Sequence, residues 1–243
     1  MEFPLSLTEV IIALVIVIIG GILQGSIGFG LGPFCAPLLV LVNPALIPGP
    51  LLMIALALTL LMFQREKHAV KVGEIKWAVA GRVLGSILGA FMLTLISKDF
   101  LTLFFGFIML MAALILISGM HPALTIKSLI GAGVLSGFMG TTASIGGPPM
   151  ALLYQRKEGP RIRGTLSGVF IIGTIIAILS LLVIGKFGLQ EFWLAVILIP
   201  GVVIGFFISN RTAPILDRGF MRPVILTVSL ISSLFIIIKS LCF

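Results

Sequence analysis

The sequence predicts an all-α integral membrane protein built from two inverted structural repeats, each a broken helical hairpin followed by three transmembrane helices. Three observations support this prediction: the composition, two interrupted apolar regions, and loop charges that change sides between the halves. Of the 243 residues, 59% are hydrophobic and 10% are charged, whereas a soluble domain carries roughly 45–50% apolar and about 25% charged residues. With a mean hydropathy of +1.29, the chain leaves no room for a domain outside the membrane.

Six apolar runs are long enough, or nearly so, to cross a bilayer as single helices, because a span needs about 20 residues. Each run is bounded by charged residues or by Gly/Pro-rich breaks. The runs cover 48–63, 75–96 and 100–118 in the first half and 164–184, 189–209 and 220–238 in the second.

Two further apolar regions, 8–42 and 128–154, are interrupted midway by the segments GSIGFGLGP and GTTASIGGPP. Glycine lowers helix stability by about 1 kcal/mol and interior proline by about 3 kcal/mol. Each region is therefore expected to form a hairpin of two helical limbs that enters and leaves the membrane on the same side. Proline suits the first position of a helix, so the returning limbs are predicted to start at about Pro33 and Pro148.

The chain is predicted to divide into two repeats, 1–120 and 121–243. The segment GILQGSIG at 21–28 matches GVLSGFMG at 133–140, and each is followed by a Gly-Pro step. Later in each half, a GxxxGxxxG run that starts at Gly81 matches a GxxxGxxxS run that starts at Gly201.

Loop charges predict that the two repeats have opposite orientations in the membrane. Four loops hold twelve of the 16 Lys and Arg residues, and corresponding loops of the two halves differ in charge. If basic loops face the cytoplasm, the second repeat is inverted and both termini are external to the plasma membrane. This asymmetry also explains the net charge of +8 without nucleic-acid binding. The acidic N-terminus lacks the basic start of a secretory signal and is expected to be part of the mature protein. The four basic loops are 64–76, 119–127, 155–163 and 210–222.

The two hairpin breaks are predicted to form an anion site. Inverted repeats with discontinuous helices that meet near the membrane midplane are typical of secondary transporters. Broken backbone is tolerated there only where protein or a water-filled cavity satisfies it. The starts of the returning limbs offer free N–H groups and positive dipole ends, which favour anions. The predicted substrate-binding residues are Gln24, Ser26, Gly28, Gly32, Thr141, Thr142, Ser144, Gly146 and Gly147.

Arg82 is the single charged residue inside a predicted span, roughly 10 Å from its basic end. In one interpretation it lines an inner vestibule and attracts cytoplasmic anions, since ionisable residues within membranes are usually functional. In the other it extends its side chain to the headgroups. The hairpin hydroxyls and amides are expected to bind the substrate without a buried charge, because an arginine beside them would hold the anion too tightly.

Neither a cofactor nor a metal is expected. The two cysteines, Cys35 and Cys242, have no metal-ligand spacing. His68 and His121 fall in loops, and all eight acidic residues lie at span ends or in loops, so no intramembrane protease site is expected. Without a protonatable group at depth, we predict anion export driven by membrane potential. Self-association is left open.

The hairpin segments GGILQGSIGFGLGPFCAPLL and GVLSGFMGTTASIGGPPMALL resemble the TauE/SafE family of membrane permeases, also called sulfite exporters. The resemblance implies transport, commonly outward, of small sulfur-containing or carboxylated organic anions such as sulfite, sulfonates or sulfoacetate within the lipid bilayer. Arg82 lies outside the matched segments. Two alternatives stay open: an anion channel, which would show flux without saturation, and, less favoured, an intramembrane enzyme.

Overall fold

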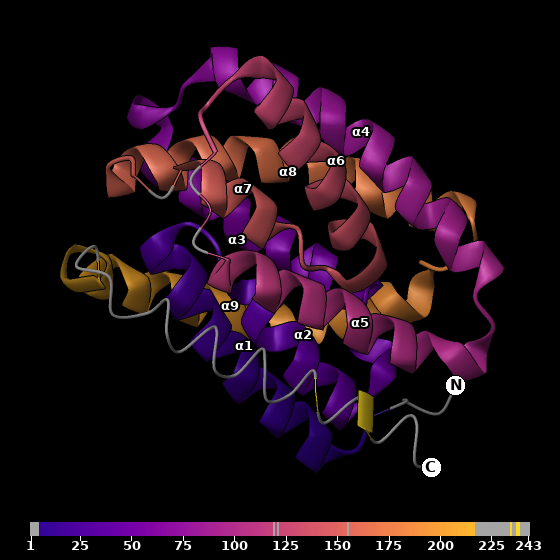
Figure 1. Ribbon diagram of the computed structural model, residues 1–243. Coiled ribbons are helices and arrows are strands. Elements are labelled where there is room, and N and C mark those ends of the chain that lie inside the picture. The colour runs from indigo at the N-terminus through magenta and orange to yellow at the C-terminus, as the bar shows by residue number, and fades with distance from the viewer. Residues whose placement is uncertain are drawn as a thin grey trace.

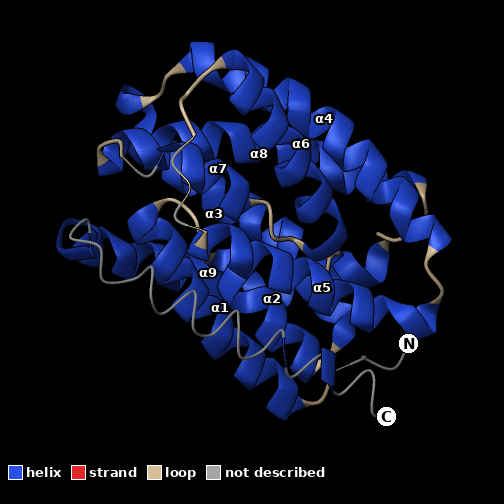
Figure 2. Cartoon of the chain, in the orientation of Figure 1, coloured by secondary structure: helices blue, strands red, loops and turns tan. Residues whose placement is uncertain are grey.

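The computed structural model describes residues 5–118, 120, 122–154, 156–216, 234, 237 and 238. Within that part of the chain every regular element is a helix, and Figure 2 shows helices joined by loops without a strand. The prediction of an all-α fold is confirmed.

Both predicted hairpins are present as pairs of helices separated by a short break. The first consists of α1 (Leu7–Ile27) and α2 (Leu31–Val42), and the second of α6 (Ile126–Ala143) and α7 (Gly147–Tyr154). The long limbs end because the next residue adopts the left-handed conformation, with φ of 94° at Gly28 and 61° at Ser144. The returning helices start within two residues of the predicted prolines.

The single spans also follow the predicted apolar runs. The helices are α3 (Gly49–Glu66), α4 (Val72–Leu95), α5 (Lys98–Ile117), α8 (Gly159–Val183) and α9 (Leu189–Leu216), with short 3-10 turns η1 (Pro44–Leu46) and η2 (Lys67–Ala69). The largest difference is at α9, which continues seven residues past the predicted end at 209. The predicted span 220–238 and the end of the loop 210–222 lie largely outside the described residues, as does His121.

Six helices of the described chain are long and apolar enough to cross a membrane: α1, α3 with η2, α4, α5, α8 and α9. Large apolar side chains cover their outer surfaces; Phe91 is 61% exposed and Val183 88% exposed. A soluble protein rarely exposes such continuous apolar surface, so these faces contact lipid. The chain is a multi-pass membrane protein.

The long helices lie side by side in the order α6, α4, α8, α3, α9, α1, each in contact with the next (Figure 1). Each helix in this series corresponds to a helix of the other predicted repeat: α6 to α1, α4 to α9, and α8 to α3. Replacing each helix by its counterpart gives the same order read from the other end. Two halves with related folds would give this order of contacts. Their inversion in the membrane stays a prediction.

Glycines let the long limb of each hairpin pack closely on a helix of the other half. A Cβ atom at Gly81 or Gly85 of α4 would overlap a backbone carbonyl of α6, and one at Gly205 of α9 would lie 2.5 Å from the carbonyl of Ile18 in α1. Such small-residue contacts are typical of membrane helix pairs. Each hairpin is thereby positioned by the opposite repeat.

Candidate functional site

The tips of the two hairpins touch. Gly32, at the start of α2, lies against the break between α6 and α7. A Cβ atom at Gly32 would overlap the carbonyl oxygen of Ser144 and would lie 3.2 Å from the Cα atom of Ile145. Glycine is therefore required for this approach, and the structure brings together the two breaks that the sequence singles out.

A cavity of about 30 Å³ lies beside this contact. Residues from both hairpin tips and from the neighbouring helices line it. Five of the predicted substrate-binding residues line it: Gln24, Gly32, Ser144, Gly146 and Gly147. The other lining residues are Gly30, Pro33, Leu52, Ala55, Thr59, Arg82, Gly140, Phe170 and Thr174.

Arg82 contributes its guanidinium to this same cavity. The residue lies ten positions into α4, about 15 Å along the helix, and is only 2% exposed, so it does not extend to the headgroups. The structure therefore places Arg82 at the cavity that residues of both hairpin tips line, and its role in an inner vestibule stays a prediction. The expectation of a binding region without a buried charge is corrected accordingly, because α4 packs on α6 with this side chain turned inward.

The guanidinium has neutral neighbours. Its Nη1 donates a hydrogen bond of 2.8 Å to the Ser136 hydroxyl, and its carbon lies 5.2 Å from the centre of the Phe170 ring, a distance at which cation–π attraction is favourable. The Nε of Arg82 has no hydrogen-bond acceptor. None of the ion pairs formed by the described residues includes Arg82, so its charge is unneutralised by protein there.

Three glycines make room for this side chain. A Cβ atom at Gly173 of α8 would overlap the Nε of Arg82, and one at Gly146 would lie 3.1 Å from its Nη1. At Gly140 the corresponding distance, to Nη2, is 3.4 Å. The space for the guanidinium is therefore supplied by α6, α8 and the second hairpin break together.

Ser136 connects Arg82 to the tip of the second hairpin. Its hydroxyl accepts the hydrogen bond from Arg82 and donates one to the carbonyl of Gly146. Sequence reasoning missed Ser136 as a site residue, although a signal was present: in the matched repeat segments it occupies the position of Gln24.

Gln24 performs a related task at the first tip. Its side-chain oxygen accepts a hydrogen bond of 3.2 Å from the backbone N–H of Leu31, the first residue of α2. One backbone amide at the start of α2 is therefore already bonded within the protein, and Gln24 also lines the cavity. At the second tip, the hydroxyl of Ser144 donates to the carbonyl of Pro48 at 2.7 Å.

Four predicted site residues do not line the cavity. The hydroxyl of Ser26 bonds to the carbonyl of Ile22 and to Thr212, and that of Thr142 bonds to the carbonyl of Phe138 in its own helix. The other two, Gly28 and Thr141, are likewise not among the lining residues. Conversely, sequence reasoning missed Thr59, Phe170 and Thr174, because a single hydroxyl or ring in an apolar helix carries no signal of its direction.

The described residues contain no group of three or more His, Cys, Asp or Glu side chains that could hold a metal ion. The donors at the cavity are a guanidinium, a carboxamide, hydroxyls and the backbone at two helix starts. This set matches the hydrogen-bond acceptors of an oxyanion.

Comparison with known proteins supports this chemistry. A model of the sulfite exporter TauE/SafE family matches residues 12–236, nearly the whole chain. Comparison with curated proteins and with solved structures gives no match. Members of this family are membrane transporters of the sulfite and sulfur-anion exporter type, not enzymes. The chain belongs to the TauE/SafE sulfite exporter family.

Proposed function

We propose that this transporter moves a small oxyanion, sulfite or a related sulfur-containing or carboxylated anion, and binds it in the cavity between the hairpin tips. The observation that carries the proposal is the buried Arg82 guanidinium, which has no acidic partner among the described residues. An isolated buried charge is unfavourable by several kcal/mol. A bound anion would reduce that unfavourable free energy, so the buried guanidinium favours anion binding.

The remaining donors suit binding that can be reversed. The carboxamide of Gln24 and the hydroxyl of Thr174 lie at the cavity with Gly32 and Gly147, which stand in the first turns of α2 and α7. Backbone N–H groups in a first turn have no partner within their helix. One positive charge surrounded by neutral donors holds an anion less firmly than several cations would, which permits release on the other side.

The contact between the two hairpin tips supports a carrier in preference to an open channel. Gly32 packs against the carbonyl of Ser144 beside the cavity, so we infer that the tips move before substrate passes from one side of the membrane to the other. A site that opens and closes in each cycle turns over a limited number of ions. Flux through the protein is therefore expected to saturate with substrate concentration, whereas a channel would not saturate in the same range.

We further propose electrogenic export with the basic loops in the cytoplasm and both termini outside. No Asp, Glu or His lines the cavity, and an anion that leaves a cell gains about 2.3 kcal/mol per charge per 100 mV. Lys157 lies in the basic loop 155–163. A cysteine in its place, in a protein with Cys35→Ala and Cys242→Ser, is expected to resist a membrane-impermeant thiol reagent applied to intact cells, and labelling from outside would contradict this orientation.

The purified protein in liposomes tests the proposal. We expect saturable sulfite flux that follows an imposed membrane potential and persists without a pH gradient. Arg82→Gln should weaken apparent affinity by about 10- to 150-fold, the range for a lost charge-assisted hydrogen bond, and Arg82→Lys should be intermediate. Arg211→Gln, which removes an exposed charge from the end of α9, is the matched control. Equal affinity in the Arg82→Gln and Arg211→Gln proteins would refute the assigned site.

A further inference from the structure

A second charged cluster lies between the cavity and the basic end of the helices. It consists of Arg65 and Glu66 at the end of α3 and Arg163 near the start of α8, here called the ion-pair cluster. Thr59, on α3, lines the cavity, and Arg65 follows six residues later, about 9 Å further along the helix. On α8, Arg163 precedes the cavity residue Phe170 by about 10 Å.

Glu66 joins the two arginines through a single oxygen atom. Its Oε1 accepts hydrogen bonds from the Nε atoms of Arg65, at 3.1 Å, and Arg163, at 2.8 Å. Arg163 is almost completely buried. The carboxylate therefore connects α3 to α8. These are the two central helices of the contact series given above, and both contribute residues to the cavity lining.

The same arginines hold the end of α1, whose last turn leads into the first hairpin tip. Arg163 donates to the carbonyl of Ser26 at 2.9 Å, and Arg65 donates to the carbonyl of Gly25. The carbonyl end of a helix carries partial negative charge, so both contacts are electrostatically favourable. Gln24, the residue before Gly25, lines the cavity, and the cluster is therefore connected to the cavity through the tip itself.

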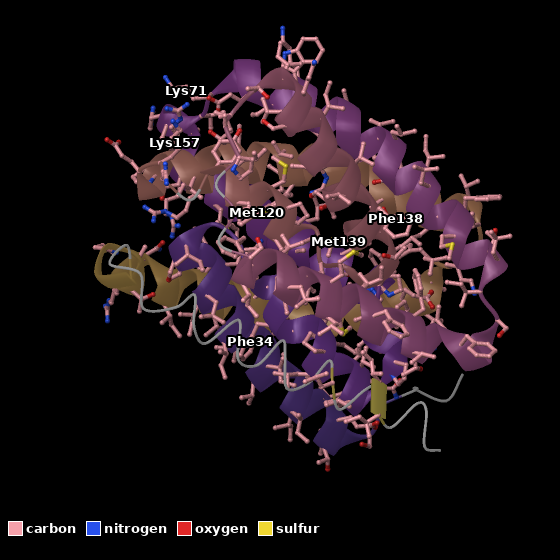
Figure 3. All side chains as sticks on the ribbon, viewed as in Figure 1. Phe34, Lys71, Met120, Phe138, Met139 and Lys157 are labelled. Carbon is pink, nitrogen blue, oxygen red and sulfur yellow. The ribbon has the colours of Figure 1, made fainter. Side chains whose placement is uncertain are left out.

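Arg65 also reaches α9. Its Nη1 donates to Asn210 at 2.7 Å and to Ser209 at 3.1 Å. A further ion pair, between Arg161 and Glu74, joins the starts of α8 and α4 at the same end. Figure 3 shows basic side chains gathered at this end, where Lys71 and Lys157 are labelled. The helices that surround the cavity are thus tied together by charged contacts at their basic ends.

We propose that the ion-pair cluster is the gate of the transport pathway on the basic side: it keeps the cavity closed there and separates when the cavity opens to that side. Glu66 is its central residue, because its carboxylate accepts from both arginines and so ties α3 to α8, and loss of the carboxylate removes that tie. This inference goes beyond the proposed substrate, since the gate would act on any solute that uses the cavity.

Thiol accessibility tests the gate without a known substrate. A cysteine at Thr59, in a protein with Cys35→Ala and Cys242→Ser, reports whether the cavity is open. A membrane-impermeant thiol reagent is applied to each face of membrane vesicles, with a Lys157→Cys protein identifying the basic face. We expect Glu66→Gln to raise the labelling rate at position 59 at least tenfold from the basic face only. Glu158→Gln, which neutralises an exposed carboxylate on the same face, should leave the rate within about twofold.

Arg163→Lys provides a second variant if the Glu66→Gln protein does not fold. Lysine keeps the charge but cannot contact Glu66 and the Ser26 carbonyl in the bidentate manner of arginine, so an intermediate increase is expected. An unchanged rate in both variants, or an increase from the opposite face, would overturn the gate. The Arg82→Gln substitution should not change this labelling pattern, so failure of the substrate assignment and failure of the gate give different results.

Discussion

The two hairpin tips are built on the same backbone plan but differ at two equivalent positions. In the matched repeat segments Gln24 corresponds to Ser136, and in the matched glycine runs Val202 corresponds to Arg82. At the first tip a long carboxamide is combined with a buried valine on the partner helix α9, and Gln24 reaches the start of its own return helix. At the second tip a short hydroxyl is combined with a buried arginine on the partner helix α4, and Ser136 bonds to both Arg82 and the carbonyl of Gly146.

The helices around the two tips are therefore arranged symmetrically, whereas the side chains at equivalent positions differ and make the site asymmetric. A second arginine at the buried position of Val202 would add another charge inside the protein, at a large desolvation cost. The other arginines at the first tip lie toward the basic end and share Glu66. Among the described residues, buried charge without an ion-pair partner is thus limited to Arg82, where the proposed substrate can neutralise it.

The largest effect on this comparison is expected from Arg82→Val, which makes the surroundings of the second tip resemble those of the first. Apparent affinity for sulfite is expected to fall by about 10- to 150-fold. Thermal stability in detergent should be retained or raised, because an unpaired buried charge is removed. Proteoliposome flux and thermal unfolding of the same sample measure both quantities. A destabilised protein with unchanged affinity would indicate that Arg82 is structural.

Gly173→Ala tests whether the guanidinium requires its present position. The added methyl group would overlap the Nε of Arg82, and crowding of this kind costs about 1–3 kcal/mol, which corresponds to at least about a fivefold loss of affinity if the arginine is displaced. The control is Gly131→Ala in α6, where a Cβ atom meets nothing within 4 Å. Equal transport by the two variants would show that the position of the guanidinium is adjustable.

Ser136→Ala sharpens the comparison by removing the link between Arg82 and the second tip. The loss of a neutral hydrogen bond is expected to weaken affinity by about two- to tenfold, a smaller effect than loss of the charge. Ser180→Ala is the matched control, because that hydroxyl bonds only within its own helix. Loss of affinity in the Ser136→Ala protein as severe as in Arg82→Val would mean that Ser136 itself contacts the anion.

The smallest effect is expected for Thr142→Val. Its hydroxyl already bonds to the carbonyl of Phe138 and does not line the cavity, so affinity should change by less than about twofold even though the residue lies in the second hairpin motif. Dose–response curves for flux in liposomes are sufficient to detect this. A loss greater than that of Ser136→Ala would place substrate contacts on α6 away from the cavity.

Much of the architecture followed from local chemistry. Apolar runs of the length of a bilayer predicted α3, α4, α5, α8 and α9, and Gly/Pro-rich breaks predicted both hairpins, because these residues interrupt helices wherever they occur. The matched glycine runs also indicated the close helix pairs. Residues in the two breaks, such as Gly32 and Gly147, were predicted as site residues for the same reason, because a backbone interruption is visible in the sequence. The structure shows that both line the cavity.

Side-chain direction was decided only by the tertiary structure. The sequence by itself determined that the chain is helical, lies in the membrane and has two broken hairpins. It did not determine whether Arg82 turns toward lipid headgroups or inward, because that choice depends on α6 packing against α4 and on the space left by Gly140, Gly146 and Gly173. Nor did it determine that Thr142 bonds to its own helix while Ser136 bonds to Arg82 and to the carbonyl of Gly146. Period and composition specify where helices form, whereas the rotation of each helix about its axis is specified by its neighbours.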